Sequence, residues 1–89
     1  MPHYLYILQS EATGRYYTGI SGNPERRLHF HNTMERGHTA FFRSWKIVLQ
    51  KEFPTQAEAH AAEKRVKAWK SRKMIERLLD GELHLLDDD

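Results

Sequence analysis

The chain has 89 residues, of which 39% are apolar and 29% are charged, and it contains no cysteine. This composition is typical of one small globular domain, and it excludes a fibrous protein, a disulfide-stabilised protein and a site built on thiolate ligands. No apolar run approaches the roughly 20 residues that a membrane-spanning helix needs. Residues 1–3 lead into a strand-like run without a signal-peptide pattern, so we expect a cytoplasmic protein with no membrane partner.

Charge is unevenly distributed along the chain. All 14 lysines and arginines lie in residues 1–79 together with seven acids, whereas residues 80–89 carry five acids and no lysine or arginine. A basic body indicates a polyanionic partner such as nucleic acid, but a small protein also needs surface charge for solubility, and charge alone favours neither explanation. We predict one domain over residues 1–81 and a disordered acidic tail over residues 82–89.

The first part of the chain predicts a β-hairpin followed by a helix. Residues 3–9 and 15–20 are rich in the apolar and aromatic side chains typical of strands, and the residues between them have the composition of a turn. Asn23 suits a helix N-cap, and Pro24 suits the first helical position, where its missing N–H is not needed. We expect this helix to end near Thr33.

The second part of the chain predicts a third strand and two more helices. Residues 45–53 suit a strand, which we expect at the centre of the sheet. Thr55 suits an N-cap, with Glu58 three residues later as in a capping box. Apolar residues then recur at helical spacing to a break near Ser71, and again to a stop at Gly81. The order β-β-α-β-α-α predicts an α/β fold with helices flanking a small three-stranded antiparallel sheet.

Several side chains in these elements suit the cleavage of a phosphodiester bond. The reaction needs an attacking water, a group that accepts its proton, stabilisation of charge on the phosphate and usually a divalent metal. Arginine offers phosphate a planar fork, a carboxylate binds magnesium, and tyrosine acts as a base only when a nearby cation lowers its pKa from about 10. The chain offers two strand tyrosines, an arginine and a histidine one helical turn apart, and a later glutamate: Tyr6, Tyr17, Arg27, His31 and Glu63.

Each of these residues also has an ordinary structural explanation. Tyrosine favours strands in general, so Tyr6 and Tyr17 could be packing residues. Arg27 could be a solvated helix residue, and Glu63 could pair with Lys67 at i+4, an interaction worth only about 0.3–0.5 kcal/mol. The six histidines show no spacing typical of a zinc site, so we expect none.

Taken in order, these residues form a set that resembles the GIY-YIG endonuclease superfamily, and most closely its compact single-domain members of the excision-repair-nuclease type. The two halves of the motif correspond to Tyr4-Leu5-Tyr6 and Tyr17-Thr18-Gly19, and the resemblance covers roughly residues 3–80. Tyr4 stands where the family motif has glycine, and Thr18 stands where it has isoleucine. Both are backbone or packing positions. A further polar residue that some family members use in catalysis could correspond here to Thr39, Arg43 or Ser71.

The resemblance implies a role for each matched residue. Tyr17 takes the place of the proposed general base, and Tyr6 takes that of the tyrosine that holds the attacking water or the substrate phosphate. Arg27 matches the arginine that binds the scissile phosphate. The remaining matches are a polar residue that supports the site, a glycine that turns the chain tightly toward it, and the sole acidic metal ligand: His31, Gly19 and Glu63.

The resemblance therefore implies a DNA endonuclease that depends on one Mg²⁺ or Mn²⁺ ion, is directed by DNA structure and acts in DNA repair or processing. A nucleic-acid-binding module that is catalytically idle, or active only with a partner protein that supplies specificity, remains an alternative, as does a structural or interaction domain. The cationic run after Glu63 suits either a solvated face or contacts to the DNA backbone without sequence recognition. The residues we expect to bind nucleic acid are Lys64, Lys67, Lys70, Arg72 and Lys73.

Overall fold

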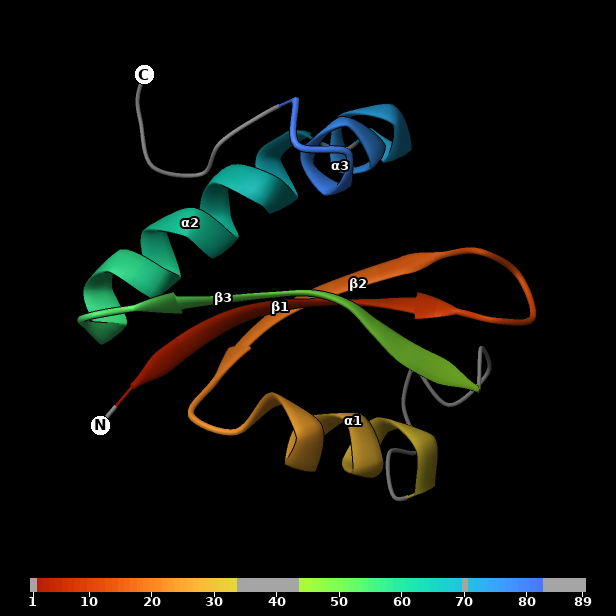
Figure 1. Cartoon of the computed structure of the whole chain (residues 1–89), viewed down its shortest axis with the longest axis horizontal. Coiled ribbons are helices and arrows are strands. Elements are labelled where there is room, and N and C mark those ends of the chain that lie inside the picture. The colour runs from red at the N-terminus through yellow and green to blue at the C-terminus, as the bar shows by residue number, and fades with distance from the viewer. Residues whose placement is uncertain (1, 34–43, 70, 83–89) are drawn as a thin grey trace.

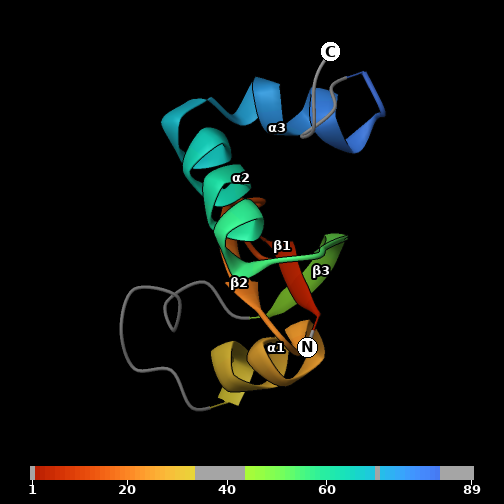
Figure 2. The same ribbon diagram turned by 90° about the vertical axis from the view of Figure 1, so that its left-hand side faces the viewer.

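A central sheet lies between helices on both faces in the computed structural model, which describes residues 2–33, 44–69 and 71–82. Figure 1 shows α1 on one face and α2 with α3 on the other, and Figure 2 shows the same separation from the side. Within the described residues, no helix is both long and apolar enough to cross a membrane. The predicted fold class and element order are confirmed: β1 (His3–Ser10), β2 (Tyr16–Ser21), α1 (Pro24–Thr33), β3 (Trp45–Phe53), α2 (Gln56–Trp69) and α3 (Arg72–Leu79).

The sheet is antiparallel throughout, and its strand order is β2-β1-β3. The expectation that residues 45–53 form the central strand is therefore wrong, because β1 is central and β3 is an edge. The side chains of β1 explain this order, since residues 5–8 are all at most 1% exposed and so need cover on both faces. By contrast, β3 carries exposed charges at Lys51 and Glu52, which suit an edge strand.

Each helix within the described residues begins at a side chain that caps it. Asn23 Oδ1 accepts a hydrogen bond from the N–H of Arg26 at 3.1 Å, and Thr55 Oγ1 accepts one from the N–H of Glu58 at 3.2 Å. Ser71, where a break was predicted, is the N-cap of α3. The predicted helix starts are therefore confirmed. They could be predicted from the sequence because capping depends on residues within one turn.

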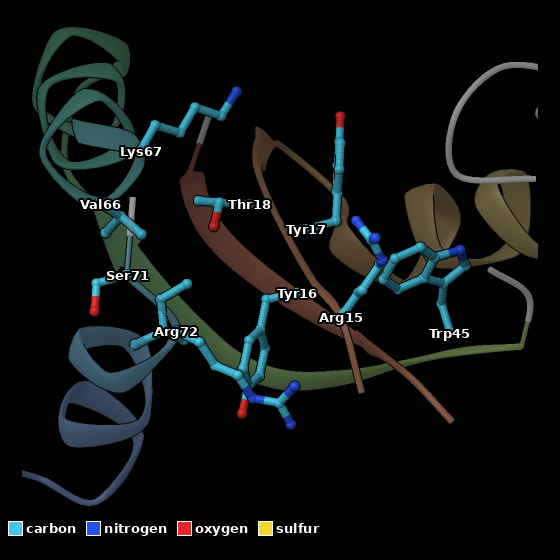
Figure 3. A pocket seen from close by; sticks show the side chains of 10 residues that line it. Arg15, Tyr16, Tyr17, Thr18, Trp45, Val66, Lys67, Ser71 and Arg72 are labelled. Carbon is cyan, nitrogen blue, oxygen red and sulfur yellow. The ribbon is translucent and has the colours of Figure 1, made fainter. Parts of the chain in front are cut away.

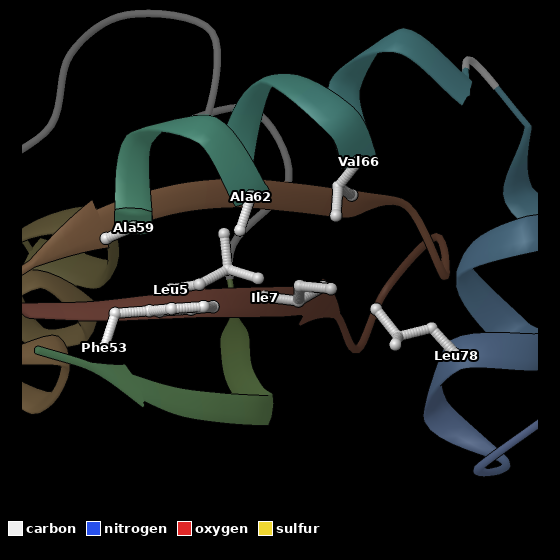
Figure 4. Packing of buried hydrophobic residues seen from close by; sticks show 7 residues of the cluster. All are labelled: Leu5, Ile7, Phe53, Ala59, Ala62, Val66 and Leu78. Atoms are coloured by element: carbon white, nitrogen blue, oxygen red, sulfur yellow. The ribbon is translucent and has the colours of Figure 1, made fainter. Parts of the chain in front are cut away.

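The main hydrophobic core lies between β1 and α2 (Figure 4). Two alanines on the inner face of α2 allow the helix to lie close to the sheet, and a valine one turn later continues the buried stripe. Leu78 extends the core to α3. The buried members of this cluster are Leu5, Ile7, Phe53, Ala59, Ala62, Val66 and Leu78.

A β-bulge distributes the apolar residues of β3 between the two faces of the sheet. The register of β1 with β3 shifts between Ile7, which pairs with Leu49, and Leu8, which pairs with Ile47. Strict alternation would place Ile47 and Leu49 on one face, but Ile47 packs in the cluster beside α1 and Leu49 packs in the α2 core. Trp45, two residues before Ile47, consequently also lies on the α1 face.

Two hydrogen bonds connect the end of α1 to the start of β3. Asn32 Nδ2 donates to the carbonyl oxygen of Trp45 at 3.1 Å, and the N–H of Trp45 donates to Asn32 Oδ1 at 2.7 Å. This paired contact fixes α1 against the sheet. The position of α1 decides where the predicted site residues Arg27 and His31 lie.

Candidate active site

The two tyrosines of the predicted motif meet on the α1 face of the sheet. In the hairpin register Tyr6 pairs with Gly19 and Leu8 pairs with Tyr17, and the ring centroids of Tyr6 and Tyr17 lie 6.4 Å apart. Tyr6, on the central strand, is 1% exposed. Tyr17, on the edge strand β2, is partly exposed and lines a pocket, so it is the tyrosine that a substrate can reach.

Helix α1 brings Arg27 and His31 to the same place. The ring centroid of His31 lies 4.7 Å from that of Tyr17, and His31 Nε2 lies 3.4 Å from the hydroxyl oxygen of Tyr6. Arg27 donates a side-chain hydrogen bond to Tyr6 and lies over the ring of Phe30, 4.5 Å from its centroid. Because arginine only donates, the oxygen of Tyr6 accepts from Arg27. Which partner donates between the Tyr6 hydroxyl and His31 Nε2 depends on the tautomer of His31. The structure thus brings the four predicted catalytic residues into one cluster.

Burial raises the pKa of Tyr6 above its ordinary value, because the phenolate would lose its hydration in this position. The hydrogen bond and the positive charge of Arg27 oppose this increase, and the negative charges of Tyr17 (when ionised) and Glu63 add to it. Tyr6 therefore stays protonated at neutral pH. In this form it can donate a hydrogen bond or position a reacting group.

The raised pKa of Tyr6 gives a testable titration. The chain has four tyrosines, and we expect the tyrosinate absorbance of the Tyr6→Phe variant to lack the ionisation at highest pH. Since the folded pKa is raised, the linked stability is present below the unfolded pKa of about 10 and is lost as the pH rises through the folded pKa. The wild type should accordingly lose stability at alkaline pH more steeply than Tyr6→Phe. If the ionisation that disappears in Tyr6→Phe had a pKa at or below the ordinary tyrosine value, the assignment of a raised pKa to Tyr6 would be contradicted.

Gly19 lies within β2 and not in a turn, so the predicted reason for this glycine, a tight turn toward the site, is wrong. The described glycines with positive φ are Gly14 and Gly81. A Cβ atom at Gly19 would lie 2.7 Å from the hydroxyl oxygen of Tyr6 and 2.8 Å from its Cζ. Gly19 is a glycine because the ring of Tyr6, its partner in the register, occupies the space that a side chain would need.

Glu63 lies on α2, which covers the sheet face opposite α1, and its side chain is 14% exposed. Its Oε2 lies 2.9 Å from Lys67 Nζ, and its Oε1 lies 3.6 Å from His60 Nδ1. The charge of Glu63 nevertheless acts on the hydroxyl group of Tyr6. The ion pair with Lys67, which the i+4 spacing allowed, is thus present in the structure.

The donor set around Glu63 fits a magnesium-type ion better than a zinc ion. Within residues 2–33, 44–69 and 71–82, no group of three or more His, Cys, Asp or Glu side chains could hold a metal. Structural zinc sites need four protein ligands, whereas Mg²⁺ is often held by one or two carboxylates, waters and phosphate oxygens of the substrate. A single carboxylate such as Glu63 leaves room for those oxygens.

A pocket of about 570 Å³ extends over the free edge of β2 and includes Tyr17 (Figure 3). Lys67 and Arg72, two of the residues expected to bind nucleic acid, line it. Lys64 and Lys73 are exposed but do not line it, and Lys70 lies outside the described residues. A second cavity of about 390 Å³ lies beside Arg27 and is lined by Ser21, Asn23, Arg26, Arg27, His29 and Phe30.

Several residues that line the larger pocket were not predicted as site residues from the sequence, among them Arg15, Tyr16 and Trp45. Arg15 could have been predicted as a site residue from the sequence, because strand alternation places it on the same face as Tyr17. Trp45, whose ring centroid is 6.4 Å from that of Tyr17, could not, because its position depends on the bulge in β3.

Comparison with known proteins agrees with this arrangement. The model of the GIY-YIG catalytic domain matches residues 2–76, which include the whole cluster and Glu63. The solution NMR structure of the UPF0213 protein BH0048 from Bacillus halodurans is similar, with 32% sequence identity, a TM-score of 0.58 and coverage of 90% of this chain and 84% of that one. No curated protein matches the chain. On the extent of the domain match, this chain belongs to the GIY-YIG catalytic domain family.

Proposed function

We propose that this chain is a metal-dependent DNA endonuclease that is directed by DNA structure and acts in DNA repair or processing in the cytoplasm. The observation that carries the proposal is the contact cluster of Tyr6, Tyr17, Arg27 and His31 on the α1 face of the sheet. Packing alone does not call for a buried tyrosine hydroxyl held by both an arginine and a histidine. Phosphodiester cleavage needs such groups, because it requires a proton acceptor and donors that stabilise the phosphate.

Within this proposal each residue of the cluster has its own task. Tyr17 is accessible and, as the phenolate left when its own hydroxyl proton has passed to solvent, accepts the proton of the attacking water. Arg27 binds the scissile phosphate through its planar fork, and its contacts with Tyr6 and Phe30 orient the guanidinium. Tyr6 remains neutral and positions the reacting groups, while the buried His31 holds the Tyr6 hydroxyl in place.

Glu63 would hold one Mg²⁺ or Mn²⁺ ion. A bound divalent cation supplies positive charge that stabilises the negative charge developing on the phosphate. The half-buried position of Glu63 and its electrostatic effect on Tyr6 support this assignment.

The contact between Glu63 and Lys67 favours a second candidate function. The ammonium group of Lys67 lies 2.9 Å from the carboxylate and neutralises the charge that a metal ion would need. In a catalytically idle DNA-binding module, or in one activated by a partner protein, this pair would persist. Such a module would tolerate the loss of the Glu63 carboxylate.

The Glu63→Gln variant separates the two candidates, because it removes the charge and keeps the size of the side chain. We expect magnesium-dependent cleavage of labelled nicked, flapped, branched or single-stranded DNA, abolished by EDTA and reduced at least about 100-fold in Glu63→Gln. Glu52→Gln, on the opposite edge of the sheet, is the matched control and should cut like the wild type. Binding without cleavage under every condition would favour the idle or partner-activated module, and cleavage unaffected by Glu63→Gln would place the metal elsewhere.

A further inference from the structure

The pocket over the edge of β2 combines basic side chains with apolar and aromatic ones. Its cations come from three separate parts of the fold: Arg15 just before β2, Lys67 on α2 and Arg72 at the start of α3. None of the residues that line it is acidic. In Figure 3, Tyr17 and Lys67 extend in the same direction from β2 and α2. The remaining lining residues include the half-buried or buried side chains of Tyr16, Val66 and Ile75.

Arg72 is held in place at the Tyr16 side of this pocket. Its guanidinium lies over the ring of Tyr16, 5.6 Å from the centroid, and its Nε lies 3.0 Å from Glu76 Oε2. A Cβ atom at Gly14, in the β1–β2 turn, would lie 2.9 Å from Arg72 Nη2. The guanidinium therefore bridges α3 and the hairpin and is presented together with an aromatic ring.

This combination distinguishes between kinds of nucleic acid. Cations alone would suit the phosphates of a duplex or of a single strand, because both carry the same backbone charge. The aromatic and apolar walls suit the face of a base, and in a duplex that face is stacked and cannot be reached. A volume of about 570 Å³ lies in the range of small-ligand sites.

We infer that this pocket binds one unpaired nucleotide next to the scissile phosphate. Its backbone phosphate lies against Arg15 and Lys67, and its base lies against Tyr16 and the guanidinium of Arg72. Tyr16 and Tyr17 are adjacent in β2 and point to opposite faces of the strand, so the bound strand passes over the strand edge from one to the other. The inference rests on the proposed function and defines its substrate class as DNA with an unpaired nucleotide at the cleavage position.

The test is a binding measurement in EDTA, which does not depend on cleavage. The probe is a fluorescently labelled duplex with one bulged 2-aminopurine, compared with the same duplex fully paired. We expect the full-length wild type to bind the bulged duplex about tenfold more tightly and to change its 2-aminopurine fluorescence, as stacking on an aromatic side chain predicts. Tyr16→Leu, which keeps an apolar side chain, should lose this preference and the fluorescence change.

Arg72→Gln should also reduce the preference for the bulged duplex, by about fivefold. It should lower the slope of log affinity against log salt concentration by about one. Arg77→Gln is the matched control, because Arg77 lies on the same helix, is also paired with a glutamate and does not line the pocket. Thermal unfolding of each variant verifies that it is folded.

Equal affinity of the wild type for both duplexes, or equal effects of Arg72→Gln and Arg77→Gln, would overturn the inference even if the protein cuts DNA. A preference that depends on Tyr16 and Arg72 in a protein that never cuts would support the pocket and overturn the nuclease proposal instead.

Discussion

Replacement of Tyr17 by phenylalanine is expected to reduce DNA cleavage by about 10²- to 10⁴-fold, the range typical of the loss of a general base. The variant removes only the hydroxyl group. The ring, which lies 4.7 Å from the ring of His31 and 6.4 Å from that of Trp45, can keep both contacts. Folding and DNA affinity should therefore stay close to those of the wild type, and the loss should appear in the chemical step.

Single-turnover cleavage at saturating enzyme, together with fluorescence anisotropy for affinity, measures the two quantities separately. Tyr4→Phe is the matched control, because Tyr4 lies on β1 outside the cluster and loses the same atom. Cleavage by Tyr17→Phe within tenfold of the wild type would mean that another group accepts the proton. A loss of affinity as large as the loss of cleavage would mean that Tyr17 binds DNA and does not act as the base.

The parts of the fold that depend on neighbouring residues could be predicted from the sequence. The caps at Asn23 and Thr55 act within one helical turn, and the structure contains both. Arg27 and His31 lie one turn apart on α1, so helical geometry alone places them on one face. Strand alternation likewise brings Tyr17 to the same face as Gly19. For this reason the residues that make up the cluster could be predicted from the sequence.

The features that depend on pairing between distant segments could not be predicted. The order of the strands is decided by which strand needs cover on both faces. The alternation of side chains along β3 is interrupted by a bulge, which no local sequence motif predicts. The bulge determines which face carries Trp45, and thereby one wall of the pocket. The sequence likewise allowed Glu63 either a metal or Lys67 as its partner, and the 2.9 Å contact with Lys67 is visible only in the structure.

The role of Gly19 also depends on a distant residue, and it leads to the second large effect. In Gly19→Ala the new Cβ would lie 2.7–2.8 Å from the oxygen and Cζ of Tyr6, closer than real Cβ contacts. Tyr6 is 1% exposed and bonded to Arg27 and His31, so its ring cannot move without displacing both. We expect a loss of about 1–3 kcal/mol in the free energy of unfolding, as for other overpacked sites. Cleavage should fall by about 100-fold, because an error of about 1 Å in position costs that much.

Gly22→Ala is the matched control for this prediction. A Cβ at Gly22 would meet only the carbonyl oxygen of Pro2, at 3.6 Å, which is an ordinary van der Waals contact. Its effect on stability should stay within about 0.5 kcal/mol, as for surface substitutions in general. The comparison separates the clash with Tyr6 from any general effect of replacing a glycine by alanine near the site.

A double-mutant cycle tests whether Tyr6 is the cause. In a Tyr6→Leu background the ring that meets the new Cβ is gone, so Gly19→Ala should cost much less stability than it does in the wild type, and the two changes should not add. Chemical denaturation of the four proteins gives the coupling free energy directly. If Gly19→Ala cost the same in both backgrounds, the glycine would be required for a backbone reason, and the space it leaves for Tyr6 would not explain its presence in β2.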